Sequence, residues 1–348
     1  NKLLIRILLH LQVEFSKKCN RMKNIIIERY LYWKNIIQKR QNALKATKNH
    51  QVRLYNWCNV WKQDYWLINF IEKRGLLKNK PKIKIGLYSI FAPMWLNYLD
   101  HNDIRIFIER ENLHKKNMQK WQHRFLDNSR IDLSLGFDFI NHQQYMRFPF
   151  WIMWNTFSPT ATHDEIKQQI VKMNSPENHS YENRKFCAFL CSHNDIGREK
   201  IFDQLNNIDK VDCDGRLFHN NDELKLIYND DKLEYLKHYR FNLTPENSNH
   251  DNYVTEKLFE AIYSGCIPIY NGSNNHPEPN ILNQDAIIFI EMGKENSNSI
   301  KLITELNSNP SKYMEFACQK RFIDGADEAI WEYYEGLENK IKEIINNI

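Results

Sequence analysis

The pattern of apolar and polar residues between 239 and 270 predicts a strand, a polar loop, a helix and a second strand. Tyr239 to Leu243 is a short apolar and aromatic run of the strand type. After a polar loop, apolar residues recur with the period of a helix at Val254, Leu258, Ala261 and Ile262. Gly265 lies where a glycine commonly ends a helix, and residues 266–270 form a second strand-like run.

The same alternation extends over most of the chain. In the first half, strands are expected at 82–89, 103–109 and 131–140. A polar segment over 158–182 is interpreted as an interdomain linker. In the second half, strands are expected at 185–192 and 286–290, and helices at 195–205, 223–236, 300–306, 310–322 and 328–345.

This order of elements predicts an α/β protein with two Rossmann-like domains of parallel strands that face a cleft. The first domain is expected over 81–160, the second over 161–327, and a C-terminal helix over 328–348. A ligand would bind in the cleft, outside the carboxyl ends of the strands.

Residues 1–80 differ from the rest in composition and charge. They contain no Pro and one Gly, and helical spacing of Ile26, Tyr30, Trp33 and Ile37 indicates two to four helices. They carry 18 Lys and Arg against 4 Asp and Glu, whereas residues 81–348 carry 30 against 39. The sequence thus predicts a basic helical extension on an acidic body.

Three interpretations of this extension stay open. It could pack against the body with a solvated basic face, lie on an anionic membrane surface, or bind nucleic acid, which is the outcome not expected here. No stretch approaches the roughly 20 apolar residues of a membrane span, because polar residues interrupt even Leu3 to Phe15. The seven cysteines are odd in number and form no C-x-x-C pair, which favours a reducing compartment. We therefore expect a cytoplasmic protein, in solution or peripheral at the inner face of the membrane.

Lys257 is unusual because it lies in the first turn of the predicted helix. The helix N-terminus already carries partial positive charge, so a cation is unfavourable there. A bound anion would remove the conflict, since backbone N–H groups, the helix dipole and the ammonium group would converge on a phosphate. The alternative is a surface lysine paired with Glu256 or Glu260.

Three segments of this region carry a family resemblance: E-N-S at 246–248, Y-V-T-E-K at 253–257, and A-x-x-x-G-x-x-P-I-x-x-G at 261–272. Together they resemble the donor-binding motif of α-1,3-fucosyltransferases, particularly the bacterial enzymes. Weaker similarity extends from about residue 83 to 325, and residues 1–80 lie outside it. The resemblance implies a GT-B type fold, GDP-fucose as donor and a glycan acceptor. It implies no required cofactor, and an essential divalent metal is not expected.

The resemblance also implies roles for individual residues. Lys257 would contact the phosphates, Glu256 the ribose hydroxyls, and Asn247 and Tyr253 would line the donor pocket. Arg198, just after the first strand of the second domain, would grip the diphosphate with paired N–H donors.

The general base is expected after the second strand of the first domain. Glu111 fits a family pattern of Glu followed by Asn, although Arg110 stands where the family has Gly. Glu109 is the fallback base and Asp138 a weaker candidate. Arg147 is interpreted as structural, with Asp138 as a partner if it is buried.

Asp212-Cys213-Asp214 is interpreted as a turn rather than a metal-binding D-x-D motif. The favoured function is inverting transfer of L-fucose from GDP-β-L-fucose to the 3-hydroxyl of N-acetylglucosamine in a galactose-containing, Lewis-type glycan. In this hypothesis Glu111 is the base, and Arg198 and Lys257 stabilise the departing GDP. The choice between the 3- and 4-hydroxyl stays open. The alternatives are a same-fold transferase with another nucleotide sugar, and a membrane- or nucleic-acid-binding protein that acts through residues 1–80.

Overall fold

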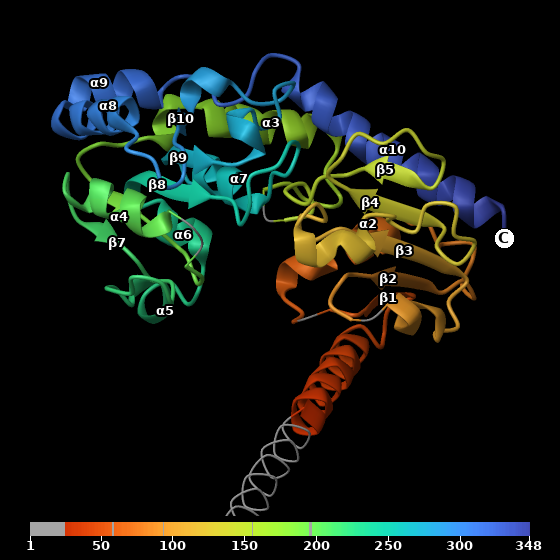
Figure 1. Ribbon diagram of the computed structural model, residues 1–348. Helices are drawn as coiled ribbons and strands as arrows, with labels where there is room; N and C mark the ends of the chain where they lie inside the picture. The colour runs from red at the N-terminus through yellow and green to blue at the C-terminus, as the bar shows by residue number, and fades with distance from the viewer. Residues whose placement is uncertain (1–24, 58, 93, 155, 195–196) are drawn as a thin grey trace, which may run out of the picture.

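The computed structural model describes residues 25–57, 59–92, 94–154, 156–194 and 197–348. They form two α/β domains, each built on a five-stranded sheet whose neighbouring strands are all parallel (Figure 1). Short 3-10 helices connect the elements at Lys62–Tyr65, Met94–Tyr98, Lys116–Trp121, Pro176–Asn178, Ser273–Asn275 and Gln284–Ala286.

The first sheet has the order β1-β2-β3-β4-β5. Its strands are β1 (Val52–Tyr55), β2 (Ile85–Tyr88), β3 (Ile104–Ile108), β4 (Leu133–Gly136) and β5 (Tyr145–Arg147). The three strands expected at 82–89, 103–109 and 131–140 are confirmed as β2, β3 and β4. Their residues are almost all buried, as in a sheet that is covered on both faces.

β1 corrects the prediction that residues 1–80 form a purely helical extension. It pairs with β2 in register, Val52 opposite Ile85, and forms the edge of the first sheet. The helix α2 (Trp66–Lys73) buries Trp66 and Phe70 in the core of the same domain. A four-residue strand is too short to show a clear period of two, and its pairing with β2 depends on residues far along the chain. The first sheet therefore starts at residue 52, not after residue 80.

The second sheet has the order β10-β9-β8-β6-β7. Its strands are β6 (Lys185–Ala188), β7 (Val211–Asp212), β8 (Tyr239–Pro245), β9 (Ile267–Asn271) and β10 (Ile288–Phe289). Its helices are α4 (Arg198–Asn206), α5 (Glu223–Leu226), α6 (Lys232–Leu236), α7 (Glu256–Tyr263), α8 (Ser297–Ser308) and α9 (Pro310–Ala317). The strand, loop, helix and strand predicted over 239–270 are thus confirmed as β8, α7 and β9.

One helix expected at 223–236 is instead two short helices, α5 and α6. Asn229 and Asp230 between them have positive φ values of 51° and 63°, which end a right-handed helix. Asp231 then starts α6, because its carboxylate accepts hydrogen bonds from the backbone N–H groups of Leu233 and Glu234, each at 3.1 Å.

The segment 158–182, predicted as a linker, contains the helix α3 (His163–Asn174). Thr162 and Glu165 form a capping box at its start, a local signal that the polar composition masked. The last helix, α10 (Ala326–Asn346), extends from the second domain along the first (Figure 1). Helix α10 therefore ties the two domains together.

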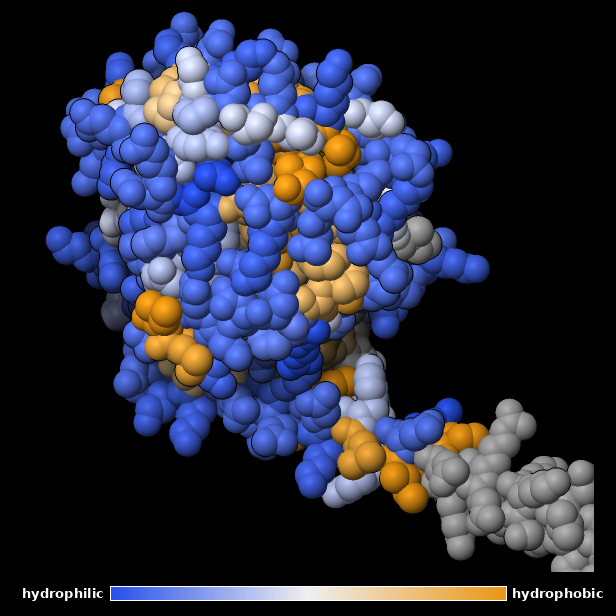
Figure 2. Space-filling view, turned by 90° about the vertical axis from the view of Figure 1, so that its left-hand side faces the viewer, coloured by the Kyte–Doolittle hydropathy of each residue, from blue (hydrophilic) through white to orange (hydrophobic). Residues whose placement is uncertain are grey.

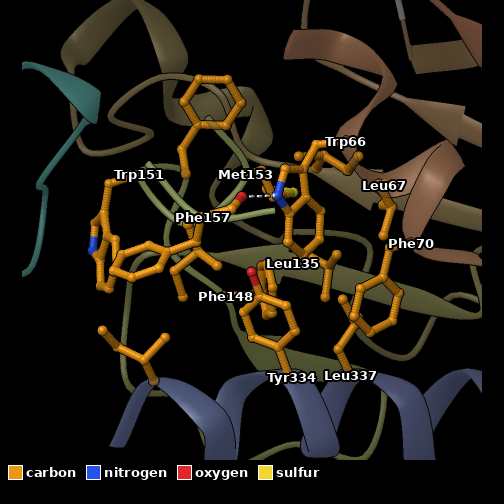
Figure 3. Packing of buried hydrophobic residues seen from close by; sticks show 14 of the residues in the cluster. Trp66, Leu67, Phe70, Leu135, Phe148, Trp151, Met153, Phe157, Tyr334 and Leu337 are labelled. Atoms are coloured by element: carbon orange, nitrogen blue, oxygen red, sulfur yellow. Dashed lines mark hydrogen bonds between the residues drawn. The ribbon is translucent and has the colours of Figure 1, made fainter. Parts of the chain in front are cut away.

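Figure 3 shows how α10 completes the core of the first domain. Tyr334 of α10 packs edge-on against Trp66 and Phe70 of α2, with ring centroids 5.5 and 5.9 Å apart. The indole Nε1 of Trp66 donates a hydrogen bond to the carbonyl of Phe157 at 2.8 Å. Residues near 66, 157 and 334 thus share one core.

Residues 25–46 form a helix that projects from the first domain (Figure 1). It contacts the body from Trp33 onward: the ring of Trp33 lies 5.8 Å from that of Trp95, and Ile36 packs with Ala92 and Leu96. The helix exposes large apolar and aromatic side chains at Ile25, Ile26, Ile27, Tyr30, Leu31, Tyr32 and Ile37. Orange hydrophobic residues are visible along this projection in Figure 2. Among the described residues, no helix is both long and apolar enough to cross a membrane.

Candidate active site

A cleft of about 490 Å³ lies between the two domains, beyond the carboxyl ends of β3, β6 and β8. All six residues singled out from the sequence line it: Glu111, Arg198, Asn247, Tyr253, Glu256 and Lys257. One comes from the first domain and five from the second. The fold therefore brings together residues that are up to 146 positions apart, as the two-domain prediction requires.

Lys257 is held in the cleft by a buried carboxylate that the sequence analysis did not single out. Its Nζ lies 3.1 Å from Glu246 Oε2 and 3.8 Å from Glu256 Oε1. Burial acts to lower the pKa of Lys257, but Glu246 and Glu256 outweigh it and raise that pKa above its ordinary value. The pairing with Glu256 is therefore present, and the cation at this helix start is compensated by two carboxylates of the protein itself.

Glu246 organises the start of α7. Its side chain is fully buried, and its carboxylate accepts hydrogen bonds at 2.7 Å from both the backbone N–H and the hydroxyl of Thr255. The Thr255 hydroxyl in turn lies 2.7 Å from Lys257 Nζ. The E-N-S segment of the motif could have pointed to Glu246 in the sequence, because this Glu directly precedes Asn247 at the end of β8.

Arg198 is the first residue of α4 and is buried against the turn that follows β6. Its Nη1 donates to the carbonyl of His193 at 2.7 Å, and its Nη2 lies 3.4 Å from Asn247 Oδ1. Gly197 before it has φ 87°, and a Cβ there would lie 2.2 Å from the backbone nitrogen of Gly293. Only glycine fits at this point, and it brings α4 close enough for Arg198 to contact the end of β8.

Glu111, in the loop after β3, lines the same cleft as Arg198 and Lys257. Burial raises its pKa, while Lys115 at 3.9 Å and Lys257 act in the opposite direction. A carboxylate with a raised pKa at the edge of a cleft is suited to accept a proton near neutral pH.

The two other base candidates lie outside the cleft. Glu109 is buried beneath Gly136 and forms an ion pair with Arg124, and burial raises its pKa to about 7. Asp138 forms ion pairs with the same Arg124 and with His114. Neither carboxylate lines the cleft, so the geometry favours Glu111 among the three candidates.

Two further expectations concern residues outside the cleft. Arg147 is buried, but its partner is Glu278 at 2.7 Å rather than the expected Asp138. Asp212 ends β7 and accepts a hydrogen bond from the hydroxyl of Tyr239 at 2.9 Å. Asp214 accepts one from the backbone N–H of Leu224 at 3.0 Å. The D-x-D segment thus has a structural role away from the cleft.

The loop between β8 and α7 contacts the first domain directly. Asn112 Nδ2 donates to the hydroxyl of Ser248 at 2.8 Å. The rings of His114 and His250 stack with centroids 3.7 Å apart, and Tyr253 packs against Phe137 at 4.9 Å. These contacts position the second-domain side of the cleft relative to Glu111.

Several further cleft residues were not predicted. Glu260 is buried, accepts a hydrogen bond from Trp154 Nε1 at 2.8 Å and lies 3.6 Å from Lys232 Nζ. It lies one turn after Glu256 on α7, and this spacing was the feature of the sequence from which its position on the same face of the helix could have been predicted. Trp61 and Arg110 line the first-domain side, and Trp61 belongs to the segment that was predicted to lie outside the domains.

Two family models match the chain. The glycosyltransferase family 10 (fucosyltransferase) C-terminal model matches residues 180–336, which contain the second sheet and α7. The α-(1,3)-fucosyltransferase FucT N-terminal domain model matches residues 52–154, which contain β1 to β5. The chain belongs to the α-1,3-fucosyltransferase family. The resemblance seen in the sequence is thereby confirmed, and the match from residue 52 agrees with the start of the first sheet at β1.

Fucosyltransferase relatives match shorter segments. The α-(1,3)-fucosyltransferase FucT of Helicobacter pylori is 32% identical over 134 residues, which are 38% of this chain and 27% of that relative. The 4-galactosyl-N-acetylglucosaminide 3-α-L-fucosyltransferase 9 of Mus musculus is 26% identical over 119 residues, 34% of this chain and 32% of that relative. The alignments thus span about a third or less of the length of these fucosyltransferases.

Solved structures of fucosyltransferases have the same fold. An α1,3-fucosyltransferase crystal structure matches with a TM-score of 0.51 at 18% identity, over 83% of this chain and 89% of that chain. An α1,3-fucosyltransferase structure with GDP-fucose matches with a TM-score of 0.53 at 19% identity, over 82% and 89%. The predicted pair of Rossmann-like domains of the GT-B type is therefore confirmed.

Proposed function

We propose that this fucosyltransferase family member transfers L-fucose from GDP-β-L-fucose, with inversion, to the 3-hydroxyl of N-acetylglucosamine in a galactose-containing glycan. The observation that carries the proposal is the cleft in which Glu111 of one domain faces Arg198 and Lys257 of the other. The name of the mouse relative states a 4-galactosyl-N-acetylglucosaminide, which supports the choice of acceptor.

The donor half would bind the nucleotide diphosphate. Arg198 and Lys257 supply cationic donors beside the start of α7, where backbone N–H groups add to the positive potential. Glu256 would accept hydrogen bonds from the ribose hydroxyls, and Asn247 and Tyr253 would line the pocket. As the bond between fucose and phosphate breaks, the two cations would stabilise the negative charge that develops on GDP.

The acceptor half would supply the base. Glu111 would take the proton of the acceptor hydroxyl as its oxygen attacks the anomeric carbon from the face opposite GDP. This displacement turns the β-linked donor into an α-linked product. The burial that raises the pKa of Glu111 makes it a stronger base, and the neighbouring cations keep it ionised near neutral pH.

The test is turnover of GDP-fucose with N-acetyllactosamine, with mass spectrometry of the product. Replacement of Arg198 or Lys257 by Ala should lower turnover by about tenfold or more, because each removes a charged hydrogen bond to phosphate. Unchanged turnover in both variants would refute the phosphate assignment. A same-fold transferase with another nucleotide sugar is the second candidate, and stronger thermal stabilisation by UDP than by GDP would favour it.

We further propose that the helix over residues 25–46 binds an anionic membrane surface, and that the protein is cytoplasmic and peripheral. Its exposed Ile26, Tyr30 and Ile37 could enter the interface while Lys34 and Lys39 contact headgroups. Co-sedimentation with vesicles that contain anionic lipid, compared with neutral vesicles, tests this. The control is a chain that starts at residue 35. It lacks most of the exposed apolar side chains but keeps β1 and the packing of Ile36.

A further inference from the structure

Arg110 lies on the first-domain side of the cleft and has a buried donor group without a partner. Its guanidinium lies 5.0 Å from the ring centroids of Trp57 and Phe150 and 5.8 Å from that of Phe91. Its Nη2 lies 3.0 Å from Asp64 Oδ1, and its side chain is 6% exposed. Its Nη1 has no hydrogen-bond partner among the residues that the structure describes.

The position of Nη1 indicates what a ligand must supply. A buried N–H without an acceptor costs free energy, and a guanidinium can only donate. Nη1 itself is buried, but Arg110 lines the cleft beside Glu111, so a small shift of the guanidinium toward the cleft would let an oxygen atom of a bound molecule accept this hydrogen bond. The three rings hold the guanidinium in place, so little side-chain entropy would be lost on binding.

Trp61 provides an apolar surface in the same cleft. It is 50% exposed, although large aromatic side chains are usually buried. Its backbone N–H donates to Asp64 Oδ2 at 2.8 Å, so the same carboxylate holds both Trp61 and Arg110. A half-exposed indole beside a polar donor suits a sugar ring, which has apolar C–H faces and a rim of oxygen atoms.

The charges on this side of the cleft favour a neutral ligand. Asp64 balances Arg110, and Lys115 lies 3.9 Å from Glu111, so each of these charges already has a partner of opposite sign. The cations Arg198 and Lys257 belong to the second domain, where the nucleotide diphosphate would occupy them. An acidic sugar on the first-domain side would therefore meet the Glu111 carboxylate without a cation left to pair with it.

We propose that Arg110 and Trp61 form the subsite that recognises the acceptor, a neutral hexopyranose unit. The sugar stacks on the Trp61 indole, and one of its oxygen atoms accepts a hydrogen bond from Arg110 Nη1. This inference rests on the proposed glycosyl transfer for the identity of the ligand. It assigns acceptor specificity to a residue that stands where the family resemblance has Gly, and to Trp61, which the sequence analysis had placed outside the first domain.

The experiment measures Arg110→Met and Trp61→Ala in two ways. Met keeps an unbranched apolar stem among the three rings and removes the donors. In transfer assays, each variant should raise the KM for N-acetyllactosamine about tenfold or more, while the KM for GDP-fucose and its hydrolysis without acceptor change less than twofold. In NMR saturation-transfer titrations without donor, each variant should weaken binding of the same disaccharide by a similar factor. Arg130→Met is the matched control, because Arg130 also stacks on a ring, Tyr98 at 4.7 Å, but does not line the cleft.

The two measurements separate the inference from the proposed function. If wild-type protein binds the disaccharide and the variants bind it equally well, the subsite is refuted, whatever the donor proves to be. If no fucose is transferred but the variants still lose disaccharide binding, the subsite stands and the proposed reaction fails. A wild-type preference for a sialylated over a neutral acceptor would overturn the inference that this subsite recognises a neutral sugar. Should Arg110→Met fail to fold because Asp64 loses its partner, Trp61→Ala decides, since truncation of a half-exposed side chain leaves the core intact.

Discussion

Replacement of Glu246 by Gln should separate the stability of the donor half of the cleft from its affinity for GDP. The substitution keeps the size of the side chain and removes its charge. One amide oxygen can retain a single hydrogen bond from Thr255, but the second 2.7 Å contact and the 3.1 Å ion pair with Lys257 are lost. Lys257 then keeps the Thr255 hydroxyl at 2.7 Å and, of its two carboxylates, only the more distant Glu256 at 3.8 Å.

The expected loss of stability follows from these contacts. A charged hydrogen bond contributes about 1.5–3 kcal/mol, and breaking a fully buried ion pair costs about 3–5 kcal/mol. The Glu246 side chain is fully buried but that of Lys257 is 24% exposed, so water can partly solvate the released ammonium group. We expect the free energy of unfolding of Glu246→Gln to fall by about 2–4 kcal/mol.

The affinity for GDP should not fall with it. In the proposed mode of binding, the diphosphate of the wild-type complex shares Lys257 with Glu246, whereas in the variant it would meet a lysine without that carboxylate. GDP should therefore bind at least as tightly, and it should restore part of the lost stability. Urea unfolding with and without GDP, together with calorimetric titration, measures both quantities. Glu295→Gln is the control, since Glu295 pairs with Lys200 at the surface and its loss should not be detectable. A tenfold loss of GDP affinity at unchanged stability would refute this account.

Four further predictions follow from the structure. Glu111→Gln should lower turnover by about 10²–10⁴-fold. Because burial raises the pKa of Glu111, the acidic limb of the wild-type pH–rate profile should lie above the usual pKa range of a glutamate. A limb at or below that range would argue against Glu111 as the base. Gly197→Ala should cost about 2 kcal/mol or more in unfolding free energy, since φ is 87° and the new Cβ would meet the backbone of Gly293, and an unchanged denaturation midpoint would contradict this. Burial lowers the pKa of His179 to about 4. The folded state therefore binds fewer protons than the unfolded state between about pH 6.5 and 4, and stability should fall as the pH drops through that window. His179→Gln should reduce this loss of unfolding free energy by about 2–3 kcal/mol, measured by denaturation at each pH. Turnover should persist after treatment with EDTA, and complete loss that Mn²⁺ restores would show that a metal takes part.

Local sequence signals predicted the donor half of the cleft well. The helical period from Val254, the glycine at 265 and the ordered motif segments located β8, α7 and β9, and they indicated Lys257 before any partner was known. Such signals succeed because a strand, a loop and a helix that follow one another carry their own pattern and capping residues. The neighbouring Arg198 was also predicted, since it follows a strand of the same sheet.

Features that depend on long-range packing were predicted poorly. Glu109, Glu111 and Asp138 are similar carboxylates in the sequence. Only the structure shows that Glu109 is buried beside Gly136 and that Arg124 forms ion pairs with both Glu109 and Asp138 outside the cleft. Glu246 was overlooked for the same reason, because its importance arises from a buried ion pair across a loop. The partner of Arg147 was wrong because Glu278 lies in the other domain.

The sequence by itself therefore determined the α/β class, the family and the group of residues suited to bind a nucleotide diphosphate. These properties follow from periodicity, turn residues and side-chain chemistry, which are read along the chain. Only the tertiary structure decided that residues 52–73 belong to the first domain, that Glu111 alone among the three candidate bases reaches the cleft, and that Trp61 and Arg110 face the acceptor half. The reason is physical: burial, ion pairing and the meeting of two domains depend on contacts between distant residues, and no local pattern encodes those contacts.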